Sequence, residues 1–313
     1  MAHGRRAWGD HDWLLYFRAT PVFVPLPRPG GSQVNIVPID PTQIRRLILF
    51  QSRRANVGHI GSCLCVVEIL AALYGQALRE TSADDPDRDR FVLSKGHAAL
   101  ALYAVLALKG WISEADLGTF CGDNSRLGVH PESSLPGVDF STGSLGHGLS
   151  FAAGAALGAR MQGSPRRAFC LLSDAECNEG SVWEAAAFAA HHRLTQLTTV
   201  LDWNGQQAFG RTCDIVDYPN LRERWEAFGW RVTEVDGHAV PALAHALSAP
   251  APPGDESPHI VLARTTFGKG VSYMERGIPI AQTHLPVNSI NWHYLPMSAA
   301  EYEMAMAELE SVG

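Results

Sequence analysis

The chain has 313 residues, of which 46 % are hydrophobic and 18 % are charged, and its formal net charge is −7. This is the composition of a folded protein, and the acidic excess excludes the basic field that binding to nucleic acid requires. The sequence has no uninterrupted run of about 20 apolar residues, so we expect no membrane-spanning helix and no membrane partner.

The first 40 residues predict an irregular N-terminal tail or extension. They contain five prolines, together with Trp8 and Trp13, and show no helical period. Arg18 interrupts the only early apolar run, which argues against a secretory signal. Residues 41–313 are expected to form one domain.

Helical patterns dominate the chain from residue 41 to about residue 120. Pro41 suits a first helical turn, and apolar residues at helical spacing follow to about Asn56. Similar patterns predict helices over residues 66–77 and 98–109, the second closed by Gly110, and Ser113 begins another helix.

Short apolar runs alternate with helical patterns in the second half of the chain. We predict strands at residues 168–172, 197–201, 231–235 and 259–263, and helices at 181–192, 221–228 and 241–247. This order predicts an α/β fold, a parallel sheet with helices on both faces, whose ligands bind beyond the carboxyl ends of the strands. The proline-rich residues 249–258 are expected to form a surface loop.

Polar residues follow two consecutive predicted strands. Asp174 comes directly after the strand at 168–172, and Asn204 follows the next strand. A carboxylate, an amide oxygen and a backbone carbonyl at this edge could hold Mg²⁺ together with phosphate oxygens. Alternatively, Asp174 and Glu176 only cap a helix and Asn204 serves a turn. The position of both residues at strand ends favours the metal site.

Two further features indicate a polar ligand pocket. The run from Ser141 to Gly148 holds three glycines, which let the backbone approach a ligand, and it opens an Ala/Gly-rich helix to about residue 159. His59, His97 and His130 each lie in a glycine-containing turn. A single histidine in such a turn is more often structural, but several beside a phosphate–metal site suit binding and proton transfer.

The six cysteines carry no paired metal-binding spacing. They lie at positions 63, 65, 121, 170, 177 and 213, and none forms a CxxC motif. We expect reduced, mostly buried thiols in a cytoplasmic protein.

Together these runs resemble the N-terminal, diphosphate-binding half of transketolases, over residues 43–309. The Gly-Asp-Gly and downstream Asn of thiamine diphosphate enzymes stand here as Ser173-Asp174-Ala175 and Asn204. The sequence that follows, Glu179-Gly180-Ser181-Val182-Trp183-Glu184-Ala185-Ala186, is similar to the transketolase continuation. The resemblance implies the thiamine diphosphate-binding fold for residues 41–313.

The resemblance also implies roles for individual residues. Asp174, Asn204 and the carbonyl of Gln206 are the implied ligands of Mg²⁺, for which Ca²⁺ or Mn²⁺ are possible substitutes. The implied contacts to thiamine diphosphate are His97, Gly143, Ser144, Leu145, Asp174, Ala175, Glu179 and Asn204, of which Glu179 matches a glutamate of the subunit-interface network. The implied catalytic residues are His59, His130 and a last histidine that is either His293 or His284. Trp292 and Pro296, which flank His293, favour His293.

Several positions depart from the family pattern. Ser173 and Ala175 replace both glycines of the metal motif, and Ala175 would be strained only if it needed a positive φ. His147 stands where full-length transketolases often carry Gln. Residues 277–288 look like an insertion before Trp292.

The resemblance implies half of an active site. A C-terminal partner subunit is expected to carry the pyrimidine-binding domain and the activating glutamate, in an α2β2 heterotetramer. The implied reaction transfers a two-carbon ketol unit from a ketose, expected to be a sugar phosphate, to an aldehyde acceptor. The alternatives are a subunit of a thiamine diphosphate-dependent 2-oxoacid decarboxylase or dehydrogenase, and a non-catalytic regulatory subunit.

Overall fold

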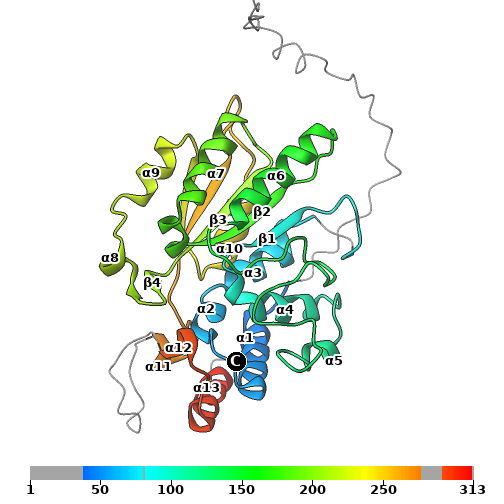
Figure 1. Ribbon diagram of the computed structural model, residues 1–313, viewed down its shortest axis with the longest axis vertical. Coiled ribbons are helices and arrows are strands. Elements are labelled where there is room, and N and C mark those ends of the chain that lie inside the picture. The colour runs from blue at the N-terminus through cyan, green and yellow to red at the C-terminus, as the bar shows by residue number, and fades with distance from the viewer. Residues whose placement is uncertain (1–37, 80–81, 276–290, 312–313) are drawn as a thin grey trace, which may run out of the picture. The chain divides into compact units, whose positions relative to one another are not determined.

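A five-stranded parallel sheet forms the centre of the chain (Figure 1). The computed structural model describes residues 38–79, 82–275 and 291–311, all within one compact unit, Val34–Gly313. The strand order is β1-β2-β3-β7-β6. The strands are β1 (Arg90–Leu93), β2 (Ala168–Ser173), β3 (Leu197–Trp203), β6 (Arg231–Asp236) and β7 (His259–Arg264). The sheet confirms the predicted α/β fold.

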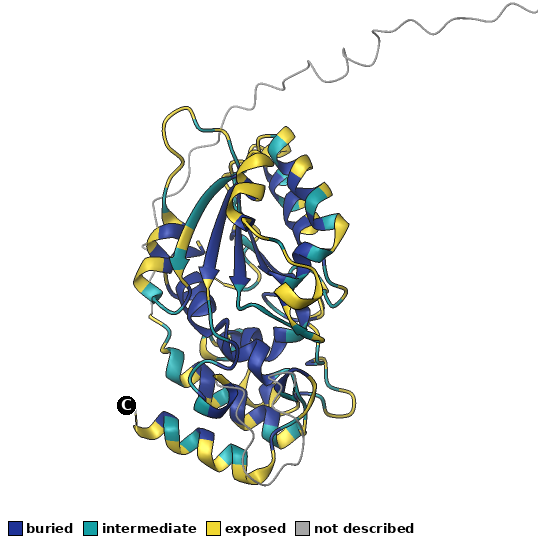
Figure 2. Cartoon of the chain, turned by 90° about the vertical axis from the view of Figure 1, so that its left-hand side faces the viewer, coloured by how far each residue is buried: buried dark blue, intermediate teal, exposed yellow. Residues whose placement is uncertain are grey.

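Successive residues of the inner strands point into two different hydrophobic cores. Phe169 and Leu171 of β2 pack into one core, whereas Cys170 and Leu172 pack into the other. Because both faces are covered, these strands read as continuous apolar runs. Figure 2 shows the inner strands buried between helices whose outer surfaces are exposed.

The first core lies between the sheet and the helices of the N-terminal half, joined by α10 and the C-terminal helices. Its main helix, α1, begins where predicted, because the Asp40 side chain accepts a hydrogen bond from the Thr42 N–H at 2.9 Å. The elements of this core are α1 (Pro41–Ala55), α2 (Ile60–Leu64), α3 (Val67–Ala72), the π-helical η2 (Leu73–Ala77), α4 (Ala99–Leu108), α5 (Glu114–Leu117), α10 (Val240–Ser248), α11 (Ser272–Glu275), α12 (Asn291–Tyr294) and α13 (Ala299–Ser311).

The second core lies under α6 (Gly148–Met161), α7 (Gly180–His191) and α9 (Leu221–Ala227). The small residues of α6 let it pack closely on β1 and β2, beside which it lies in Figure 1. Short elements complete the fold at the strand ends: η3 (Gly96–Ala98), η4 (Ala175–Asn178), the hairpin of β4 (Gln206–Gln207) and β5 (Gly210–Arg211), and α8 (Thr212–Ile215). Residues 249–258 form a loop, as predicted.

The structure differs from expectation at two elements. Strand β1 was not predicted, because its four residues are too few to show a period. The helix expected over residues 66–77 is instead α3 followed by the π-helical turn η2. Within the described residues, the 18-residue stretch Ile60–Ala77 is long and apolar enough to cross a membrane, with a mean hydropathy of 1.6. It is 94 % buried inside the protein, as a core helix would be.

The cysteines agree with expectation. All six are free, and Cys63, Cys65, Cys170 and Cys177 are buried.

Candidate active site

A pocket of about 390 Å³ opens where β1, β2 and β3 end. The loop after β1 contributes Lys95 and His97, and the chain after β2 contributes Ala175 and Glu179. Asn204 and Gln206 enter from the chain after β3. The predicted site thus lies at the carboxyl edge of the sheet, where parallel strands place loops from distant parts of the chain together.

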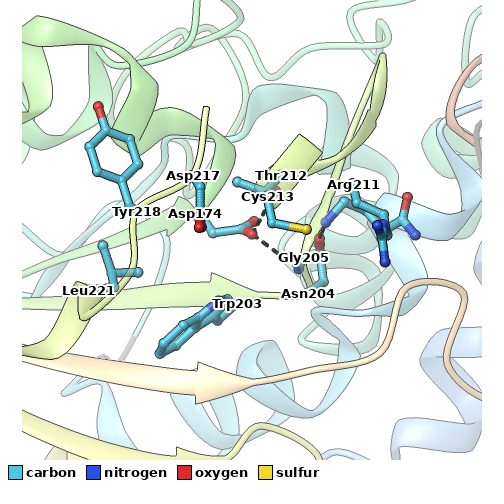
Figure 3. A pocket seen from close by; sticks show the side chains of 11 residues that line it. Asp174, Trp203, Asn204, Gly205, Arg211, Thr212, Cys213, Asp217, Tyr218 and Leu221 are labelled. Carbon is cyan, nitrogen blue, oxygen red and sulfur yellow. Dashed lines mark hydrogen bonds between the residues drawn. The ribbon is translucent and has the colours of Figure 1, made fainter. Parts of the chain in front are cut away.

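Asp174 is buried beside this pocket and only half satisfied. Its Oδ2 accepts hydrogen bonds from the Gly205 N–H at 3.1 Å and the Thr212 hydroxyl at 2.9 Å, drawn as dashed lines in Figure 3. Its Oδ1 is buried and has no hydrogen-bond partner among the residues that the structure describes. Burial, reinforced by the nearby Asp202 carboxylate, raises the pKa of Asp174 to about 7. A cation at Oδ1 would reverse that shift.

Asn204 and Gln206 stand between two pockets. Both residues line the 390 Å³ pocket, and both also line a neighbouring pocket of about 360 Å³ that contains Asp174 (Figure 3). The Asn204 Oδ1 accepts from the Gln206 N–H at 2.8 Å, which fixes the turn after β3. Among the described residues no cluster of three His, Cys, Asp or Glu side chains could hold a metal. The available donors are instead one carboxylate, one amide oxygen and backbone carbonyls, which suit a hard cation that also takes phosphate oxygens.

A buried ion pair supports the floor of the site. Lys95 Nζ lies 2.5 Å from Asp202 Oδ2, and both side chains are almost fully buried. Burial alone would lower the pKa of Lys95, but the Asp202 carboxylate outweighs it and the pKa is raised. Asp202 also accepts from the Asn204 amide at 2.9 Å. A fixed positive charge therefore sits beside the pocket, attached to the residue that orients Asn204.

Three imidazoles face one another at one wall of the pocket. The ring centroids of His59, His97 and His293 lie 5.4 to 5.8 Å apart. The His59 N–H donates to the His293 carbonyl at 3.1 Å, so the backbone itself holds α12 against α2. Within the described ranges, the Nδ1 atoms of His59 and His293 are buried without a hydrogen-bond partner. Such atoms need a ligand or water to satisfy them.

Burial keeps these histidines uncharged. It lowers the pKa of His293 to about 4, with further contributions from His59 and Lys95. It also lowers the pKa of His97, again helped by Lys95, and that of His59, helped by His130. At neutral pH each ring therefore offers one donor and one acceptor nitrogen.

The glycine-rich run also lines this pocket. Gly143 and Leu145 line the pocket, and an added Cβ at Gly143 would lie 3.3 Å from the His130 ring. His130 is exposed and lines the same pocket, and burial still lowers its pKa. Ser144 is exposed and does not line the pocket, so the structure does not bring its side chain to the other predicted residues.

Glu176 holds the glycine-rich run in place. Its fully buried carboxylate accepts from the Ser94 hydroxyl at 2.5 Å and from the N–H groups of Gly146 and Ser173, both at 2.9 Å. Gly146 has φ +84°, and a Cβ there would meet Ser181 at 2.6 Å, so only glycine fits. One side chain thus joins the ends of β1 and β2 to the turn before α6.

The other predicted residues are placed as follows. Ala175 lines the pocket and lies in η4 without a positive φ, so its replacement of glycine causes no strain. Glu179 is exposed at the rim of the pocket. His147 is exposed at the start of α6. His284 and the segment 277–288 lie outside the described residues, and the roles of all these residues stay predictions.

Sequence reasoning missed Lys95, Asp202 and the positioning role of Glu176. Each of the first two lies within two residues of a predicted site residue, His97 or Asn204, at a strand end. A charged residue at the buried end of a parallel strand could therefore have indicated that Lys95 and Asp202 belong to the site. Two exposed aromatic residues at the pocket rim, Phe209 and Tyr294, had no such signal.

Comparison with known proteins agrees with this geometry. The sequence family described as "Transketolase, thiamine diphosphate binding domain" matches residues 40–284. One similar protein is a subunit of the apulose-4-phosphate transketolase of Actinobacillus succinogenes, which is 38 % identical over 269 residues, 85 % of this chain and 92 % of that protein. The 6-deoxy-6-sulfo-D-fructose transketolase subunit SqwG of Clostridium sp. (strain MSTE9) is 36 % identical over 273 residues, 86 % of this chain and 94 % of that protein.

Solved structures show the same similarity. The transketolase of Campylobacter jejuni superposes with a TM-score of 0.74 at 27 % identity, and the match covers 89 % of this chain and 43 % of that chain. The transketolase of Leishmania mexicana gives a TM-score of 0.73 at 26 % identity and covers 86 % and 40 %. The chain therefore spans less than half the length of these solved transketolases, but nearly the whole length of the two subunit relatives.

Proposed function

The chain belongs to the transketolase family, and from this we propose that it is the N-terminal, thiamine diphosphate-binding subunit of a two-chain transketolase. The reaction transfers a two-carbon ketol unit from a ketose, preferably a sugar phosphate, to an aldehyde acceptor. The observation that carries the proposal is the convergence of His59, His97 and His293 on the same pocket as Asn204 and Gln206.

The residues at the strand ends suit the diphosphate and a magnesium ion. The bound thiamine diphosphate supplies the electron sink for cleavage of a carbon–carbon bond. We assign Mg²⁺ to Asp174, Asn204 and the Gln206 carbonyl, because Asp174 Oδ1 is buried without a hydrogen-bond partner among the described residues and these three groups all offer oxygen atoms. Ca²⁺ or Mn²⁺ could substitute at such a site. The cation would also offset the repulsion between the Asp174 and Asp202 carboxylates.

The neutral histidines suit a polyhydroxylated substrate. His97 lies beside the positive charge of Lys95, which favours a role at phosphate oxygens. The buried Nδ1 atoms of His59 and His293 suit hydrogen bonds to sugar hydroxyls, and His130, which lines the same pocket, can exchange a proton with the bound sugar. Because burial keeps their rings neutral, His59, His97 and His293 can each donate one hydrogen bond and accept another.

A partner subunit would complete the site. The two relatives that match nearly over their whole length are each named as one subunit of a transketolase, which supports a partner for this chain. At the rim of the pocket Phe209 is 77 % exposed and Tyr294 is 54 % exposed. Aromatic side chains of this kind are enriched in protein interfaces. We propose that a C-terminal subunit covers this rim, brings the activating glutamate and forms an α2β2 assembly. The free cysteines support a cytoplasmic location.

Calorimetric titration of thiamine diphosphate with Mg²⁺ tests the proposal. The titrant is added to the isolated chain and to the chain co-purified with its candidate partner, and release of aldose from ketose phosphates is then measured. We expect tight binding only in the complex, and loss of the Mg²⁺-dependent binding in Asp174→Asn. Glu256→Gln, at an exposed ion pair with Arg193, is the matched control and should bind normally. Absence of binding in both preparations would refute the proposal.

A further inference from the structure

A second pocket lies at the opposite edge of the sheet from the active site. It has a volume of about 310 Å³ and lies beside the amino ends of β1 and β2 and the last turns of α6. Three arginines line it, with one carboxylate. The lining residues used below are Arg90, Arg166, Arg167, Asp139, Gln162 and Gly158.

Positive charge is in excess around this pocket. Three arginines, Arg90, Arg166 and Arg167, line the pocket with one carboxylate, Asp139. Outside the lining, Arg88 pairs with Asp139, and Arg79 pairs with the buried Asp89, which also pairs with Arg167. The lining residues thus carry two more positive charges than negative ones, although the chain as a whole has a formal net charge of −7.

Two of these guanidinium groups converge on a single acceptor. Arg90 Nη2 and Arg166 Nη1 both donate to the Pro86 carbonyl, at 2.9 and 2.7 Å. Two cations are thus held close together by one neutral oxygen. Burial and the neighbouring Arg88 and Arg166 lower the pKa of Arg90 against the opposing effect of Asp139, as expected of crowded cations.

Arg166 also has a hydrogen-bond donor without an acceptor among the described residues. Its Nη2 bonds to the Gln162 side chain, but its Nε is buried and has no hydrogen-bond partner in the described part of the chain. Tying the loop at Pro86 to α6 requires one arginine at most. Arg90 belongs to that loop and also donates to the Asp85 and Arg88 carbonyls, so its bond to Pro86 closes the loop. Neither contact explains the buried Nε of Arg166 that is left unsatisfied.

We propose that this arginine pocket binds a small ligand that carries a phosphate dianion. Guanidinium groups match phosphate oxygens in geometry, and a charge-assisted hydrogen bond to the buried Nε of Arg166 would satisfy it. A dianion would also balance the two excess charges. Because the sheet separates this pocket from the catalytic histidines, the ligand is not the transferred sugar in its reacting position. The inference stands whether or not the proposed activity is correct.

Gly158 is a position where a charged side chain can be added without a steric clash. It lies in α6 on the wall of the pocket, and a Cβ added there meets no atom within 4 Å. Gly158→Glu therefore places a carboxylate against the arginines and removes none of their hydrogen bonds. Gly158→Gln has nearly the same size and no charge, so it is the matched control. Both changes replace a helical glycine and raise the helix propensity of α6, but the Glu carboxylate, near the helix C-terminus, is also opposed by the helix dipole.

The probe is inorganic phosphate, titrated calorimetrically into the full chain at constant ionic strength. We expect wild type and Gly158→Gln to bind phosphate equally, and Gly158→Glu and Arg166→Gln to bind it about tenfold more weakly or worse. Any phosphate that binds at the active site contributes the same heat to all four proteins and cancels in the comparison. Without phosphate, Gly158→Glu should melt at a higher temperature than Gly158→Gln, because its carboxylate offsets the excess charge.

Two results would overturn the inference. One is no phosphate binding by the wild-type chain beyond that of a chloride control. The other is equal phosphate affinity in Gly158→Glu and Gly158→Gln, which would mean that the arginines serve only to fasten the loop. Arg166→Gln could lose the link to Pro86 and unfold, but Gly158→Glu keeps that link and decides the question alone.

Discussion

Replacing the buried carboxylate of Glu176 by an amide tests how the glycine-rich wall of the pocket is held. Glu176 Oε1 accepts from Ser94 and Gly146, and Oε2 accepts from Ser173. In Glu176→Gln the new NH2 group must face either the Gly146 N–H or the Ser173 N–H. A serine hydroxyl can rotate, but a backbone N–H cannot. One buried donor is therefore left facing another donor in either orientation.

The magnitude follows from these contacts. An unsatisfied buried donor costs about 1–3 kcal/mol, and the remaining hydrogen bonds lose the strengthening effect of a charged acceptor. Against this, burial raises the pKa of Glu176, so the ionised wild-type side chain carries a desolvation cost that glutamine lacks. We expect the free energy of unfolding to fall by about 2 kcal/mol. The affinity for thiamine diphosphate should fall about tenfold, because Gly146 anchors the pocket-lining run.

Urea unfolding measures the change in the free energy of unfolding, and calorimetric titration measures the change in affinity for thiamine diphosphate. Glu179→Gln is the matched control for unfolding, since Glu179 lies three residues away but is exposed, and Glu256→Gln is the control for cofactor binding. The free energy of unfolding of Glu179→Gln should stay within about 0.5 kcal/mol of wild type. If Glu176→Gln unfolded like wild type, the hydrogen bonds would not stabilise the fold. If it lost stability but bound cofactor normally, the glycine-rich run would be positioned independently of Glu176.

Three further outcomes are expected. Asp174→Asn should abolish the increase in melting temperature that Mg²⁺ with thiamine diphosphate gives to the assembled complex, and an unchanged increase would exclude Asp174 as a ligand. His293 has a folded pKa of about 4 and an ordinary value of 6.5, so the folded chain binds fewer protons than the unfolded chain between these pH values. Its contribution to stability therefore falls as the pH drops from 6.5 to 4. In His293→Gln the free energy of unfolding, measured by urea unfolding at each pH, should change less steeply over this range, by up to about 1.4 kcal/mol per pH unit. Phe209→Ser should leave the melting temperature of the isolated chain unchanged, because the Phe209 side chain is 77 % exposed. The variant should bind the partner subunit more weakly than wild type in biolayer interferometry. Equal binding by the two proteins would place the interface elsewhere.

The sequence alone predicted the α/β architecture and much of the site. Strands β2, β3, β6 and β7 appear as apolar runs because a sheet covered on both faces needs apolar residues at every position. Asp174 and Asn204 could be placed together from the sequence because parallel strands end at the same edge. These inferences depend on local patterns and on a general rule of topology, both of which a single chain displays directly.

Only the tertiary structure decided which distant residues meet. It brings His293 to His59 through a backbone hydrogen bond, and it pairs Lys95 with Asp202 over 107 positions of sequence. It also gathers the arginines around Pro86, which in the sequence are ordinary charged residues in two polar segments. Such contacts depend on how helices and loops pack on the sheet, and packing is set by many weak interactions among residues far apart, so no local pattern records it.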